Sequence, residues 1–489
     1  MQHRQEQRGS WSRLRAIALI AVSVVFLGAG CVRDAIPQEV AARLRPVNLV
    51  WWGVNETSDD VRPLIDAYRQ IHPHVQITYR KLRLDEYETA LLDALSEGDF
   101  AGPDIISIPA TWTRRYQSKL LPAPSVVTMP FVTLTGTVRK EQVGELRATT
   151  TPNPQTLRDL FLDVVVSDVV LPREGGDAVY GLPLYVDTLV LYANRDLLNA
   201  GGIPVPAKTW AELQQQVPRL TRVAADGAIL QSGVALGTMG NVPRSFDILS
   251  LLMMQNGTQM IARGVPSFHL LPAGITGRTS LPAADALAYY ADFANPNKLV
   301  YSWNDDQPDA LEAFLQGKVA YFFGYSYHRP IIRSRAPQLN LSVSAVPHIA
   351  AAVDPQTGSV IGSDVVPGGQ GAAITYADFW LQAVSERTSA PNETWDFLTY
   401  ITTQPQVTRR FLEQAKRPTA LRSLVGEQQQ DVDLKVFANQ LLTARTWYHG
   451  KNAEGAEQAF VQLVRDAYSD TIEINRALQL AAQKIQQTL

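Results

Sequence analysis

Strand and helix patterns alternate from residue 47 to residue 108, and this alternation constrains the fold more than any other feature. The apolar runs with strand character are 47–52, 75–79 and 104–108. Helical periodicity fills the two intervals between them, over 61–68 and 87–95. Because a strand–helix–strand unit with short links pairs its strands in parallel, the pattern predicts an α/β lobe with helices on both faces of the sheet.

The rest of the chain predicts a second α/β unit followed by a helical region. Residues 181–192 form a strongly apolar run that indicates a strand, and strand–helix alternation continues to about residue 349. The C-terminal third is mainly helical. Residues 123–175 show no clear period, so we expect loops and an inserted element there.

The N-terminal segment has the order of a secretory signal: four arginines, an apolar run, small residues and then Cys31, the only cysteine. This placement resembles the lipid attachment point of a bacterial lipoprotein, although Gly28 stands where such signals usually carry leucine. We expect a signal peptide at 1–30, lipidation of Cys31 and a tether at 31–45. The alternatives are an ordinary signal with a chance cysteine, or an uncleaved anchor, which the short apolar run disfavours.

Composition excludes several classes of function. The chain carries 44 Lys and Arg against 47 Asp and Glu; residues 1–30 hold four Arg and one Glu, which leaves 40 against 46, or −6. This balance gives no attraction to nucleic acid. Beyond the signal, no apolar run is long enough to cross a membrane. With Cys31 lipidated no disulfide can form, so the fold depends on a substantial core.

No catalytic or metal-binding motif stands out. The serine nucleophile elbow, the phosphate loop and the HExxH zinc motif are absent from the sequence. His72 and His74 could chelate a metal by spacing, but no third ligand is evident, so we expect a solvent-exposed turn there. We therefore expect no enzyme activity, no cofactor and no metal.

Several short motifs follow one another along the chain in a set order. They are Gly102–Ile106 with Lys119–Pro122, the segments 181–189 and 192–197, Thr209–Leu213, and the segments 251–257, 313–320, 394–398 and 418–420. This order resembles family 1 extracellular solute-binding proteins, the maltose-binding-protein-like receptors of ABC importers. Each motif is weak alone, but together they cover nearly all of residues 46–489.

The resemblance implies a periplasmic-binding-protein type II fold, with two discontinuous α/β lobes around a hinge and a ligand cleft between them. We expect the first lobe to combine residues 46–184 with 350–403. The second lobe would combine residues 185–349 with 404–489, the last part being helical. In such a fold the lobes close on the ligand by a hinge motion.

Candidate ligand-binding residues lie where predicted strands end, which is where α/β sheets bind ligands. Asn55 and Glu56 follow the first strand, and a helix cap is the equal alternative for them. Thr111 and Trp112 follow the third strand, with helix packing as the alternative for Trp112. The remaining candidates are Tyr185, Asp187, Asn241, Tyr325, Tyr327, Trp447 and Tyr448.

Two kinds of side chain are prominent among these candidates. Asp187 stands in an apolar strand and needs a partner, either a ligand or a structural group such as a backbone amide or an arginine. The aromatic side chains offer flat faces for sugar rings, although aromatics also fill cores. Trp380 is a further possibility that the pattern also explains as the first residue of a strand.

These patterns lead to a functional expectation. We expect a monomeric, lipid-anchored extracytoplasmic receptor that delivers a small solute, a sugar or oligosaccharide, to the permease subunits of an ABC importer. One alternative keeps the fold but binds a cationic, polyamine-like solute through Asp187 and Glu56. The other is a surface lipoprotein that senses or degrades glycans without a transporter.

Overall fold

The computed structural model describes residues 36–96, 102–135, 141–273, 278–349, 352–353, 360–361, 374–469 and 472–489. Cys31 and the predicted signal peptide lie outside the described residues. The chain divides into two compact units. The smaller unit combines residues 1–46 with 128–148, and the larger unit combines residues 47–127 with 149–489.

In the described part of the smaller unit, a helix packs on a two-stranded hairpin. Its elements are α2 (Gln38–Arg43), β4 (Val126–Thr135) and β5 (Glu141–Thr150), the two strands continuing at their bases into the larger unit. The helix falls in the predicted tether. The side chains of Ile36 and Val40 approach Gly144 so closely that a Cβ atom there would meet both at 3.0 Å. Tertiary packing therefore stabilises a helix that is too short to form alone.

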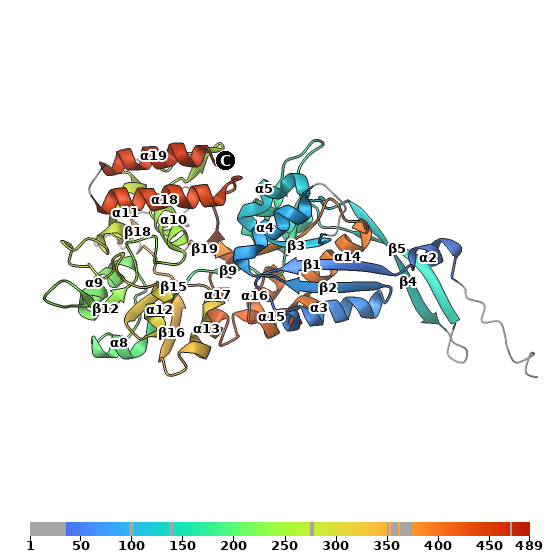
Figure 1. Ribbon diagram of the computed structural model, residues 1–489, viewed down its shortest axis with the longest axis horizontal. Helices are drawn as coiled ribbons and strands as arrows, with labels where there is room; N and C mark the ends of the chain where they lie inside the picture. The colour runs from blue at the N-terminus through green and yellow to red at the C-terminus, as the bar shows by residue number, and fades with distance from the viewer. Residues whose placement is uncertain are drawn as a thin grey trace, which may run out of the picture. The chain divides into compact units, whose positions relative to one another are not determined.

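Five strands form the first sheet of the larger unit, in the order β2-β1-β3-β20-β8. Three of them, β1, β2 and β3, are labelled in Figure 1. They are β1 (Val47–Gly53), β2 (Val75–Lys81), β3 (Ile105–Pro109), β8 (Leu182–Pro183) and β20 (Trp380–Val384). β1 pairs in parallel with both β2 and β3, which confirms the predicted parallel start of the fold. β20 comes from far along the chain and pairs antiparallel with β3 and β8.

Five other strands form the second sheet, in the order β11-β12-β15-β10-β16. They are β10 (Val190–Asn194), β11 (Arg222–Val223), β12 (Ile229–Val234), β15 (Val319–Gly324) and β16 (Leu341–Ala345). β12 and β15 are parallel, whereas β10 runs antiparallel to both of its neighbours, β15 and β16. The second α/β unit predicted from the sequence is therefore present.

A third, three-stranded sheet joins segments that pass between the two main sheets, and we call it the linking sheet. Its strands are β9 (Asp187–Thr188), β19 (Thr375–Asp378) and β21 (Ala444–Arg445). β9 connects β8 of the first sheet to β10 of the second, and β19 leads directly into β20. The apolar run 181–192 is thus three short strands and not one, because the chain changes sheets within it.

Helices cover both main sheets and fill the C-terminal third. In the first part of the chain they are α3 (Ser58–Ile71), α4 (Leu84–Leu95), α5 (Thr113–Tyr116), α6 (Pro154–Leu160), α7 (Asp163–Val169), α8 (Arg195–Ala200), α9 (Trp210–Leu220), α10 (Ser245–Gln255), α11 (Pro282–Asp292) and α12 (Ala310–Leu315). The later helices are α13 (His328–Arg335), α14 (Pro391–Thr403), α15 (Pro405–Ala415), α16 (Arg422–Gln428), α17 (Lys435–Ala438), α18 (Ala453–Tyr468) and α19 (Ile474–Gln486). Short strand pairs complete the chain: β6 (Val170–Leu171) with β7 (Ala178–Val179), β13 (Ile261–Ala262) with β14 (Val265–Pro266), and β17 (Ala352–Val353) with β18 (Val360–Ile361).

The C-terminal helices divide between the two main sheets. α15 packs against α3 beside the first sheet (Figure 1). In contrast, α18 and α19 lie side by side, and both pack against α11. The segment predicted to be helical, 404–489, therefore contributes to the surroundings of both sheets. The sequence predicts loops and an inserted element over residues 123–175; the described residues of this range contain β4, β5, α6, α7 and β6.

A buried polar contact holds the first sheet together at its centre. The indole Nε1 of Trp51 lies 3.0 Å from both Ser107 Oγ and Gln382 Oε1, and these three residues stand on β1, β3 and β20. Trp51 is fully buried. Because a buried donor without an acceptor is costly, this contact favours one register of the three strands.

Candidate ligand-binding site

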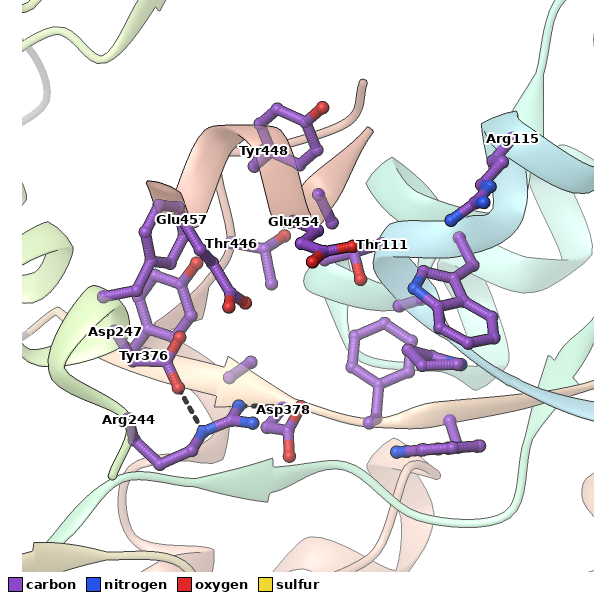
Figure 2. Close-up of a pocket in the computed structure, with 18 of the residues that line it drawn as sticks. Thr111, Arg115, Arg244, Asp247, Tyr376, Asp378, Thr446, Tyr448, Glu454 and Glu457 are labelled. Carbon is purple, nitrogen blue, oxygen red and sulfur yellow. Dashed lines mark hydrogen bonds and ion pairs between the residues drawn. The ribbon is translucent and has the colours of Figure 1, made fainter. Parts of the chain in front are cut away.

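A cavity of about 290 Å³ lies at the carboxyl end of β3, beside the linking sheet and the start of α10 (Figure 2). Its lining residues are Leu84, Glu88, Pro109, Ala110, Thr111, Trp112, Arg115, Arg244, Phe246, Asp247, Tyr376, Ala377, Asp378, Phe379, Trp380, Thr446, Tyr448, Ala453, Glu454 and Glu457. The first sheet, the linking sheet and the helices α10 and α18 thus contribute to one pocket. Its volume is near the lower end of the range for small-molecule sites.

Aromatic side chains make much of the wall of this cavity. They are Trp112, Phe246, Tyr376, Phe379, Trp380 and Tyr448. Trp112 is the most accessible of the six, while the others are buried. Its indole lies near the ring of Tyr116, with centroids 5.7 Å apart, and the Arg115 guanidinium lies 6.0 Å from the Trp112 ring.

Arg244 is the central charged group of the cavity. Its Nε lies 2.6 Å from Asp247 Oδ2 and its Nη2 lies 3.0 Å from Asp378 Oδ1, so it bridges α10 and the linking sheet (Figure 2). Its guanidinium also lies 4.8 Å from the ring centroid of Tyr325. The backbone of Arg244 has φ of 64°, a left-handed conformation that costs energy for a residue with a side chain. Strain at a cavity wall is typical of functional positions.

The surroundings of Asp247 change its acidity. Burial raises the pKa of Asp247 to about 6, and the neighbouring Arg244 opposes this rise. The hydroxyl of Tyr325 donates a hydrogen bond of 2.8 Å to the same carboxylate oxygen, Oδ2. Burial also opposes the charge of Arg244, but the carboxylates of Asp247 and Asp378 outweigh it and hold the pKa of Arg244 well above its usual range.

The remaining charged groups give the cavity an acidic rim. Glu88 is paired with Arg115, with 2.5 Å between Oε1 and Nη1. Glu454 and Glu457 extend from α18 toward the cavity (Figure 2), and neither forms an ion pair within the described part of the chain. Such carboxylates can accept hydrogen bonds from ligand hydroxyl groups.

The segment that follows β21 carries two of the lining residues, and a buried carboxylate holds it. Thr446 Oγ1 donates to Asp168 Oδ1 at 2.8 Å, and His449 Nδ1 lies 3.3 Å from the same oxygen. Asp168 stands on α7 and is 4% exposed. Burial raises its pKa. Asp168 thus positions both ends of the segment that places Thr446 and Tyr448 at the cavity.

Three of the residues expected from the sequence line the cavity. Thr111 and Trp112 form the turn after β3, and Tyr448 contributes from the segment after β21. The Tyr448 hydroxyl itself donates to the carbonyl of Thr488 at 2.9 Å, so its ring and not its hydroxyl faces the cavity. Trp380 also lines the cavity and is the first residue of β20.

Four other expected residues gather in a second group, which we call the Arg417 cluster. Its members are Glu56, Tyr185, Asp187, Tyr327 and Arg417. The Arg417 guanidinium lies 5.0 Å from the Tyr185 ring centroid and 5.9 Å from that of Tyr327. The cluster brings together the loop after β1, the linking sheet and the start of α13.

Asp187 has structural partners in this cluster. Its Oδ2 accepts hydrogen bonds from the backbone amide of Ser326 at 2.9 Å and from Ser326 Oγ at 2.6 Å, and its Oδ1 accepts from the amide of Thr188. Burial raises the pKa of Asp187 to about 7, against the opposing charge of Arg417. The backbone-amide alternative for Asp187 is therefore observed.

Glu56 and Asn55 lie at the edge of the same cluster. Glu56 is 3% exposed, and burial raises its pKa against the charge of Arg417. Its Oε1 and the Nε of Arg417 are buried without a hydrogen-bond partner among the described residues. Asn55 Nδ2 lies 3.4 Å from the Tyr185 hydroxyl. The helix cap that was the alternative for this pair is supplied instead by Thr57, through a capping box with Asp60.

The remaining expected residues are engaged in the fold. Asn241 donates to the carbonyls of Asn304 and Gln307 and accepts from the indole of Trp303. Trp447 stacks on Phe246 and is 5% exposed. Tyr325 is fully buried and does not line the cavity itself; it contacts two lining residues, through its hydrogen bond to Asp247 and through its ring beside the Arg244 guanidinium.

Sequence reasoning missed the residues that carry most of the charge of the site. Arg244, Asp247 and Asp378 form the bridge, and Arg417 organises the second cluster. Arg244 lies only three residues beyond the expected Asn241, but no local pattern distinguishes it. Asp378 was detectable as an acidic residue directly before the aromatic pair Phe379 and Trp380.

The expectation of an exposed turn at His72 is wrong. His72 is 1% exposed, and its Nε2 lies 3.4 Å from Asp396 Oδ2, because α3 packs its last turn against α14. Across the described residues, no group of three or more His, Cys, Asp and Glu side chains is arranged to hold a metal ion. In that same part of the chain, no helix is long and apolar enough to cross a membrane.

Comparison with solved structures defines the fold. The chain is similar to the GacH receptor of Streptomyces glaucescens, solved unliganded and with acarbose (TM-score 0.61, 15% identity, 91% of this chain and 98% of that chain). It is also similar to the cyclic α-maltosyl-1,6-maltose binding protein of Arthrobacter globiformis (TM-score 0.63, 16% identity, 91% and 99%). A third is the sugar-binding protein MalE of Xanthomonas citri (TM-score 0.62, 16% identity, 90% and 97%). The fold is therefore of the periplasmic-binding-protein type II, as predicted.

Sequence comparison identifies the family. A family model for bacterial extracellular solute-binding proteins matches residues 63–435, more than half of the chain. A Brucella abortus (strain 2308) protein described only as a binding protein is 23% identical over 192 residues, which are 38% of this chain and 41% of that protein. The match thus spans about two fifths of that relative. The chain belongs to the bacterial extracellular solute-binding protein family.

Proposed function

We propose that this chain is an extracytoplasmic receptor that binds a neutral carbohydrate and delivers it to an ABC importer. The observation that carries the proposal is the cavity at the carboxyl end of β3, where Trp112 and other aromatic side chains stand beside carboxylates and guanidinium groups. Sugar rings have apolar C–H faces bordered by hydroxyl groups. Aromatic faces match the first, and planar polar side chains match the second.

The Arg417 cluster favours a neutral ligand over a cationic one. The polyamine alternative relied on Glu56 and Asp187 as charge partners for the solute. Arg417 already supplies a positive charge near both carboxylates, and Asp187 is further engaged by Ser326. A cationic solute would have to compete with the half-buried guanidinium that lies over the Tyr185 ring, and displacing it would leave that charge without its partners.

The relatives support a binding role over an enzymatic one. The family consists of solute-binding proteins, and the similar solved structures include receptors for acarbose and for maltose-related sugars. We propose that the carboxylates of the cavity, such as Asp247 and Glu457, hold ligand hydroxyl groups and do not cleave a glycosidic bond.

Ligand delivery would work by closure of the two lobes. We propose that the chain passes from one lobe to the other at the linking sheet, near residues 187, 375 and 444, where the three strands of that sheet stand. Three short strands are the covalent connection between the main sheets, so bending there would move one lobe against the other. The closed form would then be recognised by the permease subunits of the importer.

The proposed location rests on the N-terminal sequence. We propose cleavage before Cys31, attachment of acyl chains to its sulfur and retention of a monomeric protein at the outer surface of the cell membrane. A receptor held beside its transporter acts at high effective concentration. Mass spectrometry of the membrane-extracted protein tests this part, because an unmodified Cys31 contradicts it.

The binding function is tested by native mass spectrometry of freshly purified protein. We expect a co-purified solute with the mass of an oligosaccharide, and we expect it to be absent from the Trp112→Ala variant. The control is Arg335→Ala, which should retain the solute, because Arg335 does not line the cavity and its guanidinium pairs with the exposed Glu312. Release of shortened sugars on incubation would instead indicate a degrading enzyme. Spermidine in place of a sugar would favour the cationic alternative.

A further inference from the structure

The hairpin of the smaller unit has one charged face and one apolar face. Arg147 stacks over Phe131 at 4.4 Å and pairs with Glu145, so these side chains share a face of the hairpin. Because successive side chains of a strand point to opposite faces, Val132 and Leu134 lie on the other face. They are 39% and 63% exposed.

Helix α2 covers part of this apolar face. Gly144 is an odd number of residues from Arg147 along β5, so it belongs to the face opposite the charged one, together with Val132 and Leu134. Ile36 and Val40 pack on Gly144 there. The apolar surface therefore continues beyond the helix, and its uncovered part consists of the two exposed β4 side chains.

The proposed lipid attachment point is close to this face. Ile36 is five residues from Cys31 along the chain. Five extended residues span at most about 18 Å, so acyl chains on Cys31 would hold the membrane within that distance of Ile36. Ile36 itself contacts the hairpin, so the apolar face is the described surface tied most directly to the bilayer.

We propose that this face, defined by Val132 and Leu134, docks on the lipid bilayer and orients the receptor there. The proposal rests on lipidation of Cys31, as proposed above. Two exposed apolar side chains are too few for a stable protein–protein interface, which requires much more buried area. Because the lipid anchor already holds the protein at the membrane, these two side chains do not have to supply the membrane affinity themselves.

The test uses a fluorophore attached to single introduced cysteines in the full, lipidated chain. The natural sequence suits it, since Cys31 is the only cysteine and its sulfur is blocked by the lipid. The variants are Leu134→Cys, the matched neighbour Thr133→Cys on the opposite face, and Leu299→Cys, a site 85% exposed in the larger unit. Each is labelled with an environment-sensitive nitrobenzoxadiazole group and placed in vesicles of phosphatidylethanolamine and phosphatidylglycerol with doxyl-labelled acyl chains.

We expect the label at position 134 to shift its emission to the blue and to be quenched by the doxyl lipids. The label at 133 should respond less than the label at 134, and the label at 299 gives the response of a highly exposed site that is not part of this face. Equal quenching at 133 and 134 would overturn the proposal, because it would reflect nearness to the membrane without docking of one face. An unshifted label at 134, or a shift that depends on protein concentration and so reports a second copy, overturns it as well.

A failure of the anchor is distinguishable from a failure of docking. If mass spectrometry finds Cys31 unmodified, the lipid attachment is wrong and this inference falls with it, while sugar binding is unaffected. If Cys31 is lipidated and the label at 134 stays in water, only the docking of the hairpin is wrong.

Discussion

Removal of Arg244 should destabilise the protein in a way that depends on pH. Its guanidinium contacts Asp247 and Asp378 at 2.6 and 3.0 Å, and the side chain is 31% exposed. Breaking a fully buried ion pair costs about 3–5 kcal/mol, whereas an exposed pair contributes about 0.2–1 kcal/mol. For this partly buried bridge, together with its contact to Tyr325, we expect Arg244→Ala to lower the free energy of unfolding by about 2–3 kcal/mol at pH 8.

The pH dependence follows from the acidity of Asp247. Its pKa is about 6 in the folded protein, above the ordinary value of 3.8. Above pH 6 the carboxylate is charged and needs the guanidinium. At pH 5 it is largely protonated, so the loss caused by Arg244→Ala should fall to about 1 kcal/mol, the scale of a partly exposed pair with Asp378 alone.

The assay is urea unfolding followed by tryptophan fluorescence at pH 8 and pH 5. Asp247→Asn and the double variant complete a cycle that isolates the interaction between the two side chains. Arg244→Gly adds a second control. It removes the same charge but relieves the left-handed backbone, so it should be about 1 kcal/mol more stable than Arg244→Ala. An equal loss at both pH values, or no coupling in the cycle, would refute this account of the bridge.

Three further substitutions test other parts of the structure. Because the pKa of Asp187 is raised to about 7, the folded state binds its proton more tightly, and the free energy of unfolding falls as pH rises from about 4 to 7. Asp187→Asn should remove this part of the pH dependence measured by urea unfolding. The same pH dependence in the variant and in the unchanged protein would contradict this. Gln382→Leu takes an acceptor from the Trp51 indole and should cost about 1–3 kcal/mol in the same assay, with an unchanged midpoint as the contrary result. Asp168→Ala removes the acceptor that holds Thr446 at the cavity, so it should weaken solute binding and lower the free energy of unfolding by about 1–3 kcal/mol; calorimetry that finds full affinity contradicts this role.

The fold could be predicted because its signals are local and repeated. The strands around Trp51 and the helix after Thr57 depend on apolar periodicity and on a cap, both of which are contained in short windows of sequence. The apolar run that contains Asp187 could not be divided correctly, because the point where a chain leaves one sheet for another is set by tertiary pairing. Helix α2 was not predicted from the sequence for the same reason, since it depends on contact with Gly144.

The candidate site was predicted only in part. Thr111 and Trp112 could be predicted from the sequence, because ligands commonly bind at the carboxyl end of a parallel strand. Arg244 and Arg417 were not, since their importance comes from partners more than a hundred residues away, such as Asp378 for Arg244 and Tyr185 for Arg417. Such pairs leave no pattern in a single sequence.

The central claim is that the aromatic cavity binds a neutral sugar, and isothermal titration tests it most directly. The purified chain would be titrated with a panel of neutral mono- and oligosaccharides and, separately, with spermidine. We predict saturable binding of at least one neutral saccharide, weakened at least about tenfold by Trp112→Ala, the loss expected when about 1.4 kcal/mol of ring stacking is removed. Trp112→Phe should restore part of the affinity. Binding of spermidine with no response to any saccharide, or saccharide binding that Trp112→Ala leaves unchanged, would contradict the account.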